Sequence, residues 1–89
     1  MNITTLFEKQ YTCPKGDKKT LKYALCESKK ENRTAYGAQM ILHTKDTSET
    51  ETSEDIFMDR NSAQNFIRLL YENSADIVHF KDLVYDYII

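Results

Sequence analysis

The spacing of apolar side chains changes once along the chain, and this change limits the possible folds more than any other feature. In the first half, apolar residues recur at every second position, as at Leu21, Tyr23 and Leu25. From residue 63 to residue 88 they recur at intervals of three and four. A period of two is typical of strands with one buried face, and a period near 3.6 is typical of amphipathic helices. The chain should therefore form strands first and helices second.

Turn signals divide the first half into strands. We expect strands over Thr5–Cys13, Thr20–Glu27 and Thr34–Thr44, a solvated loop over Lys45–Ser53, and a short fourth strand over Glu54–Asp59 with Ile56 and Met58 facing the core. The first turn contains Pro and Gly, which favour a reversal of the chain.

A register between the first two strands follows from their apolar faces. If Tyr11 pairs with Leu21, then Phe7 opposes Leu25 and Lys9 opposes Tyr23. This register puts the larger apolar groups on one side, as a half-buried sheet requires. It also places Cys26 opposite Leu6 and far from Cys13, so we expect two reduced thiols and no disulfide.

The second half predicts two helices, over about 61–74 and 77–88. Asn61 is the expected N-cap of the first, with Gln64 three residues later, and Asp76 is the expected cap of the second. The link between them is short, so they should form a helical hairpin.

Together these elements predict one α+β domain over residues 1–89. An antiparallel meander of three to four strands should pack against a C-terminal two-helix hairpin. The expected core residues are large and apolar: Leu21, Leu25, Met40, Phe66, Leu70, Phe80 and Leu83.

No pattern in the sequence predicts a catalytic, cofactor or metal site. The two glycines form no phosphate-binding loop, and the two histidines lie in different segments. A metal set of His43, Glu54 and Asp55 can be imagined, but nothing in the spacing requires it. A cysteine–histidine pair would need the fold to bring together residues far apart in sequence. We therefore expect no enzyme, no cofactor and no metal.

Charge is unevenly spread, with net +5 over residues 1–45 and −7 over residues 46–89. Basic groups cluster at two predicted turns, beside strand tyrosines. Successive turns of a meander lie at opposite ends, so we do not expect these clusters to form one nucleic-acid surface. The basic groups are Lys15, Lys18, Lys19 and Lys22 at the first turn, and Lys29, Lys30 and Arg33 at the second; the tyrosines are Tyr11, Tyr23 and Tyr36.

The acidic stretch over 46–59 is a candidate contact for a basic protein surface, as in an inhibitor that mimics nucleic acid. A mobile solvated loop is the simpler interpretation. Tyr85 and Ile89 lie off the apolar stripe of the last helix, and an exposed aromatic there can mark a protein contact. The candidate contact residues are Asp46, Glu49, Glu51, Glu54, Asp55, Asp59 and Tyr85.

Residues 61–88 resemble an uncharacterised family of short Firmicutes proteins that contain a domain of unknown function. In that family a strand meander precedes a closing helix pair, and the second helix often opens as His79, Phe80 and Asp82 do here. Val78 stands where the family often has proline. The resemblance implies a bacterial cytoplasmic protein with no established activity, and it implies that His79 belongs to a helix cap.

These observations favour a small, non-enzymatic protein that binds or regulates another protein. A phage-type inhibitor of a host nuclease or defence complex, acting through residues 46–59, is the alternative, and nucleic-acid binding through the basic turns is a further one. The N-terminus shows no signal peptide and no apolar run is long enough for a transmembrane helix, so we expect a cytoplasmic location. A homodimer remains open.

Overall fold

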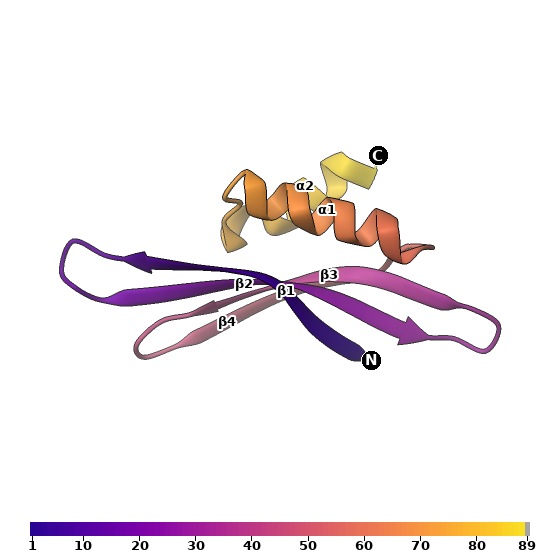
Figure 1. Cartoon of the computed structure of the whole chain (residues 1–89), viewed down its shortest axis with the longest axis horizontal. Helices are drawn as coiled ribbons and strands as arrows, with labels where there is room; N and C mark the ends of the chain where they lie inside the picture. The colour runs from indigo at the N-terminus through magenta and orange to yellow at the C-terminus, as the bar shows by residue number, and fades with distance from the viewer. Residues whose placement is uncertain (89) are drawn as a thin grey trace.

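The computed structural model describes residues 1–88 and confirms the predicted α+β meander. Four antiparallel strands lie in sequence order: β1 (Asn2–Thr12), β2 (Lys18–Lys29), β3 (Thr34–His43) and β4 (Ser48–Phe57). They are followed by α1 (Arg60–Glu72), a short 3-10 helix η1 (Ile77–His79) and α2 (Phe80–Ile88). The strands are long, so the molecule measures 50 × 24 × 17 Å (Figure 1).

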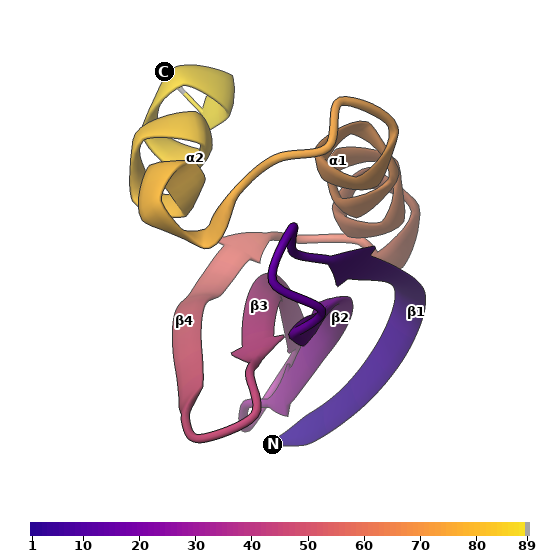
Figure 2. The same cartoon turned by 90° about the vertical axis from the view of Figure 1, so that its left-hand side faces the viewer.

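Both helices lie on the same face of the sheet. Seen along the strands, α1 sits above β1 and β2, and α2 sits above β4 (Figure 2). The large apolar side chains between these layers form one continuous core. Six of the seven predicted core residues are buried, and Leu83 is partly buried against the same cluster.

The register between β1 and β2 differs from the prediction by two residues. Tyr11 pairs with Lys19, Lys9 with Leu21 and Phe7 with Tyr23. The turn is tighter than assumed, because the Cys13 amide donates to the Asp17 carbonyl and Gly16 adopts a φ of 90°. A shift of two residues leaves each side chain on its predicted face. This shift and a bulge between Thr5 and Phe7 together move the partner of Cys26 from Leu6 to Ile3.

The prediction of a loop over Lys45–Ser53 was wrong, because β4 begins at Ser48. The hydroxyls of Thr44 and Thr47 lie 2.8 Å apart, and the Thr44 amide donates to the Thr47 carbonyl, which closes a tight hairpin. The threonines that suggested a solvated loop are β-branched residues that suit an edge strand. Gln39 joins this strand to β3 through a 2.9 Å hydrogen bond to Thr52.

A large bulge near the end of β4 changes which of its last residues face the core. Tyr36 pairs with Phe57 and Ala38 with Ser53, so residues 54–56 together oppose the single residue Gly37. Asp55 takes a positive φ of 55° within this bulge. Ile56 packs against the core as predicted, and Phe57 does so too. Met58, which was also predicted to face inward, is 73% exposed.

Gly37 is required by the close approach of this bulge. A Cβ built on Gly37 would lie 2.1 Å from the Ser53 carbonyl oxygen and 2.9 Å from the Glu54 Cα. β4 therefore crosses the face of β3 that points away from the helices. On that face the buried residues of β2 are small, Ala24 and Cys26, unlike the large ones on the helix-covered face.

The N-cap of the first helix lies two residues earlier in the chain than predicted. Asp59, and not Asn61, is the N-cap: its carboxylate accepts from the Ser62 amide and the Ser62 hydroxyl, both at 2.8 Å. These hydrogen bonds lower the pKa of Asp59. Asp76 caps the second helical segment as expected, accepting from the Ile77 amide at 2.7 Å, but that segment starts with the 3-10 turn before α2.

Candidate protein-binding groove

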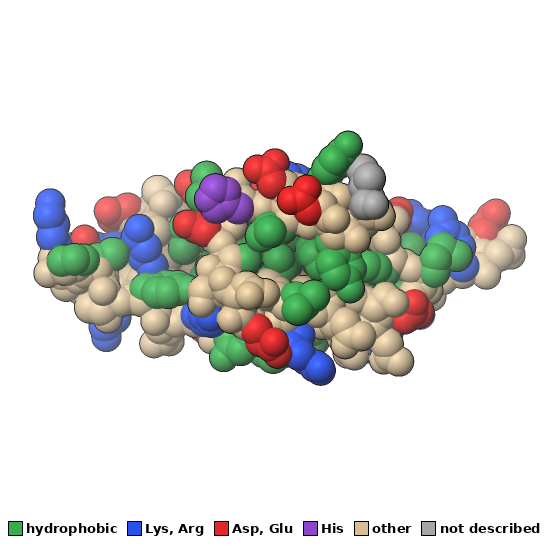
Figure 3. Space-filling model, turned by 90° about the horizontal axis from the view of Figure 1, so that it is seen from above, with side chains coloured by type: hydrophobic (Ala, Val, Ile, Leu, Met, Phe, Trp, Pro, Cys, Tyr) green, Lys and Arg blue, Asp and Glu red, His purple; other side chains and the backbone are tan. Residues whose placement is uncertain are grey.

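An apolar groove runs between α1 and α2 on the helix-covered side of the molecule. Hydrophobic side chains fill the space between the helices in the view onto this side (Figure 3). The cavity measures about 310 Å³, at the lower end of the range of ligand pockets. Its lining residues come from both helices and from the link between them: Phe66, Leu69, Leu70, Asn73, Ala75, Leu83, Asp86 and Tyr87.

The wall on α1 follows from helical spacing. Phe66, Leu70 and Asn73 lie on one side of the helix, at intervals of four and three, and Leu69 borders them. Phe66 and Leu70 are buried toward the sheet, while Leu69 is 43% exposed. The groove thus joins the hydrophobic core directly to the surface.

The link after α1 is fixed by hydrogen bonds. Ser74 has a φ of 53°, and the Ala75 amide donates to the Leu70 carbonyl, which closes the helix end in a Schellman pattern. The buried Tyr23 hydroxyl on β2 donates to the Ala75 carbonyl at 2.9 Å. Burial raises the pKa of Tyr23 well above its ordinary value, so its hydroxyl stays a donor. The floor of the groove is therefore held to the centre of the sheet.

The wall on α2 is seated on β4. Phe80 and Val84 are buried beneath the helix, and the Lys81 ammonium donates to the Thr52 carbonyl of β4 at 2.6 Å. Tyr87 reaches across the groove: its ring lies 4.8 Å from that of Phe66 and 5.9 Å from that of Phe57. Tyr87 nevertheless remains 45% exposed, so part of its side chain is open to solvent.

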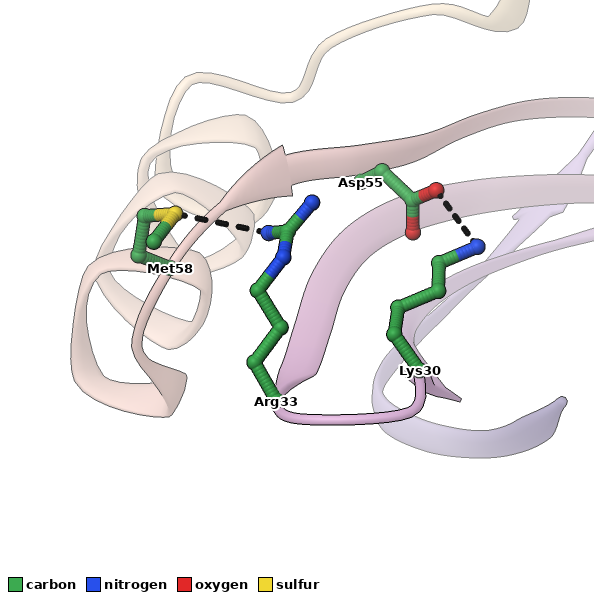
Figure 4. Close-up of polar contacts among 4 residues, drawn as sticks. All are labelled: Lys30, Arg33, Asp55 and Met58. Atoms are coloured by element: carbon green, nitrogen blue, oxygen red, sulfur yellow. Dashed lines mark hydrogen bonds and ion pairs between the residues drawn. The ribbon is translucent and has the colours of Figure 1, made fainter.

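The predicted acidic contact residues do not gather into one surface. Asp59 is occupied as the helix cap, and Asp55 forms a 3.0 Å ion pair with Lys30 at the second hairpin turn (Figure 4). Beside this pair, Arg33 reaches the sulfur of Met58. Asp46 lies at the other end of the sheet, where it borders a hollow with lysines. Glu54 lies in the bulge, near the buried Cys26 thiol.

The remaining candidates occupy separate places. Glu49 and Glu51 border a shallow hollow together with Lys19 and Lys81. Tyr85 is 64% exposed on α2 but does not line the groove. Ile89 lies outside the described residues.

The basic turns lie at opposite ends of the sheet, as their order in the meander predicts (Figure 1). At one end the tips of the first and third hairpins adjoin around a hollow of about 400 Å³. Its charged lining residues are Lys15, Asp17, Lys18, Lys19, Lys45 and Asp46.

Both cysteines are free thiols. Cys26 is buried between Ile3 and Gly37 on neighbouring strands, and burial raises its pKa to about 11. Cys13 sits partly exposed at the first hairpin tip. Within residues 1–88, His, Cys, Asp and Glu form no group of three placed to hold a metal ion, and no helix has the length and apolarity to span a membrane.

The groove was not predicted from the sequence, because no single pattern unites its residues. Phe66, Leu70 and Leu83 were assigned to the core, and Leu69 and Asp86 were not singled out. The signal was Leu69, an apolar residue three positions after Phe66 that widens the stripe of α1 beyond what the core uses.

The architecture defines a class: a small α+β protein in which an antiparallel meander carries two C-terminal helices on one face. The chain belongs to a family of unknown function, DUF6514, whose model matches residues 2–89. The family resemblance seen in residues 61–88 therefore extends over nearly the whole chain. Neither a curated protein nor a solved structure matches it.

Proposed function

We propose that this is a non-enzymatic binding protein that receives an amphipathic helix of another protein in the groove between α1 and α2. The observation that carries the proposal is the continuity of the groove with the core: Leu69 and Tyr87 are each nearly half exposed around a cavity lined mostly by apolar side chains. Apolar surface of this kind gains free energy when a partner covers it. The family resemblance supports a place of action in the bacterial cytoplasm.

A helix suits the groove because both of its walls are helices. Side chains three and four positions apart on α1 form ridges, and a third helix can pack its own ridges between them. Helix-in-groove binding uses apolar anchors at i, i+3, i+4 and i+7. The open cavity beside Leu69 and Tyr87 provides the space for such anchors.

Charge favours a different protein over a second copy of this chain. Asp86 lines the groove, and Asp82 lies one turn before it on the same side of α2. Among the described residues, two bases lie near the end of α1. Arg68 is about 200° around the helix from Phe66. Lys9 is held by the Ser74 hydroxyl and the Tyr71 ring. Within residues 1–88 the groove lining contains neither lysine nor arginine, so a second copy docked groove to groove would bring no base from its own lining to these carboxylates.

The test is binding of labelled amphipathic helical peptides, followed by fluorescence anisotropy. Leu69→Asp should weaken binding at least about tenfold, because it places a charge at the centre of the contact. Tyr85→Ser removes a more exposed apolar residue outside the groove and should leave binding unchanged. Circular dichroism of each variant checks the fold. Equal binding by the Leu69 variant, or no binding by any amphipathic peptide, contradicts the proposal.

A second candidate, nucleic-acid binding, is favoured by one observation. Lys15, Lys18, Lys19 and Lys45 converge from two hairpin tips, and none of them forms an ion pair within residues 1–88. Retention of the protein on a single-stranded oligonucleotide should then fall steeply with salt. Replacing the four lysines by glutamine should abolish retention, and retention that survives this change contradicts the candidate.

A further inference from the structure

We infer that the helix bound in the groove carries basic side chains on the flank that faces α2 and uncharged polar side chains on the flank that faces α1. This inference rests on the proposed function and specifies its partner. It follows from a difference between the two rims of the groove.

The rim on α2 is acidic. Asp82 and Asp86 are four residues apart, so they share one side of the helix, and both are exposed. Neither forms an ion pair within residues 1–88. His79 precedes them on the same side and is also exposed. The nearest base in sequence, Lys81, is turned to the opposite edge, where it donates to the Thr52 carbonyl.

The rim on α1 is polar and carries no net charge. Asn65 and Asn73 flank Leu69 there, and the Asn73 amide group already donates to the Leu69 carbonyl at 2.9 Å. Arg68 and Glu72 are exposed next to Asn65 around the helix, and their opposite charges, one helical turn apart, offset each other. A charged flank on the partner would gain little on this side.

Two carboxylates spaced by one helical turn are complementary to two bases spaced by one turn on a parallel or antiparallel helix. Lysine or arginine at i and i+4 of the partner can reach both, while its apolar face enters the groove. The side on which these bases lie then determines the direction in which the helix runs. The groove therefore selects for charge position as well as for hydrophobicity.

The experiment uses three peptides with one apolar face and different flanks: lysine, glutamine or glutamate at the i and i+4 positions. At low salt the lysine peptide should bind the full-length protein about three- to tenfold more tightly than the glutamine peptide, and the glutamate peptide should bind most weakly. Added salt should reduce the difference, because exposed charges are screened.

The decisive variant is Asp82→Lys combined with Asp86→Lys, which should reverse the order so that the glutamate peptide binds best. The matched control is Asp17→Lys combined with Glu31→Lys, which changes the net charge equally at two distant exposed turns. The control should keep the original order, which separates a local contact from the overall charge of the protein.

The outcomes distinguish the inference from the proposed function. If all three peptides bind equally and the Asp82/Asp86 variant changes nothing, while Leu69→Asp still abolishes binding, the groove binds helices but the charged flank is wrong. If no peptide binds, the proposed function fails. If sedimentation shows a dimer that Leu69→Asp dissociates, the occupant is a second copy and both statements are overturned.

Discussion

The two faces of the sheet are packed with side chains of different size, although the same strands form both. On the helix-covered face, large side chains such as Tyr23, Leu25 and Met40 fill the space beneath α1 and α2. On the other face, the buried residues Ala24, Cys26 and Gly37 are small, and the backbone of β4 closes over Gly37 directly. Large side chains exclude water from the helix-covered face, and the close approach of the β3 and β4 backbones excludes it from the other face.

This comparison shows why adjacent residues of one strand should respond differently to mutation. The helix-covered face should be sensitive to loss of volume, because truncation leaves a cavity between rigid layers. The opposite face should be sensitive to added volume, because β4 has no room to move outward without breaking its pairing with β3. Four changes test this difference, from the largest expected effect to the smallest.

Leu25→Ala should have the largest effect. Leu25 is almost completely buried within the core between the sheet and the helices. Its truncation should lower the free energy of unfolding by about 2–5 kcal/mol, measured by urea denaturation. A loss no greater than that of an exposed leucine, with Leu69→Ala as the control, would show that the helices close the cavity by moving.

Gly37→Ala should destabilise the protein although it adds only one methyl group. The new Cβ would meet the Ser53 carbonyl, so the bulge must shift, at a cost of about 1–3 kcal/mol. The control is Ala38→Gly on the other face, which removes a methyl group at the neighbouring position. Thermal unfolding unchanged by Gly37→Ala would mean that β4 does not lie over β3 as described.

Tyr23→Phe tests the polar contact within the helix-covered face. It removes the 2.9 Å hydrogen bond to the Ala75 carbonyl and leaves that buried acceptor unpaired. We expect a loss of about 1 kcal/mol. Hydrogen exchange should also quicken at the link between α1 and η1, since Tyr23 holds it to the sheet; unchanged exchange there would contradict this role.

The smallest effect at neutral pH concerns Cys26, because its contribution appears only at alkaline pH. Its folded pKa of about 11 exceeds its ordinary value of 9.0, because burial disfavours the thiolate. The unfolded chain therefore loses this proton first as pH rises above 9.0, and stability should fall between pH 9 and about 11. Cys26→Ala should flatten this part of the stability curve, whereas Cys13→Ala should not. At neutral pH, a thiol reagent should label Cys13 in the native protein and leave Cys26 unmodified.

The fold could be predicted from the sequence because its main signal is periodicity. Alternation around Leu21–Leu25 and helical spacing from Phe66 to Leu70 determine which face each element buries, and the structure confirms both. The exact pairing of β1 with β2 could not be predicted in this way, since a shift of two residues preserves every face. Only the hydrogen bonds of the Cys13–Asp17 turn decide it.

Two features were beyond the reach of local patterns. β4 reads as a loop because threonine and acidic residues suit solvated segments as well as edge strands, and its pairing with Gln39 and Met40 is a tertiary effect. The groove depends on how far apart the sheet holds the helices. A repeat of apolar residues indicates that Phe66 and Leu83 are buried, but it does not reveal that Leu69 and Tyr87 stay open between them.

The contact of Lys81 with the Thr52 carbonyl has a consequence for solubility. β4 is an edge strand, and an uncovered edge is a template for pairing with another chain. Lys81 places a charged group against that edge for as long as α2 stays on the sheet. A partner that filled the groove without displacing α2 would leave the Lys81 contact in place. A partner that displaced α2 from the sheet would leave the edge of β4 uncovered and prone to pair with another chain. The short C-terminal helix thus forms one wall of the groove and also holds a charged side chain against the edge of the sheet.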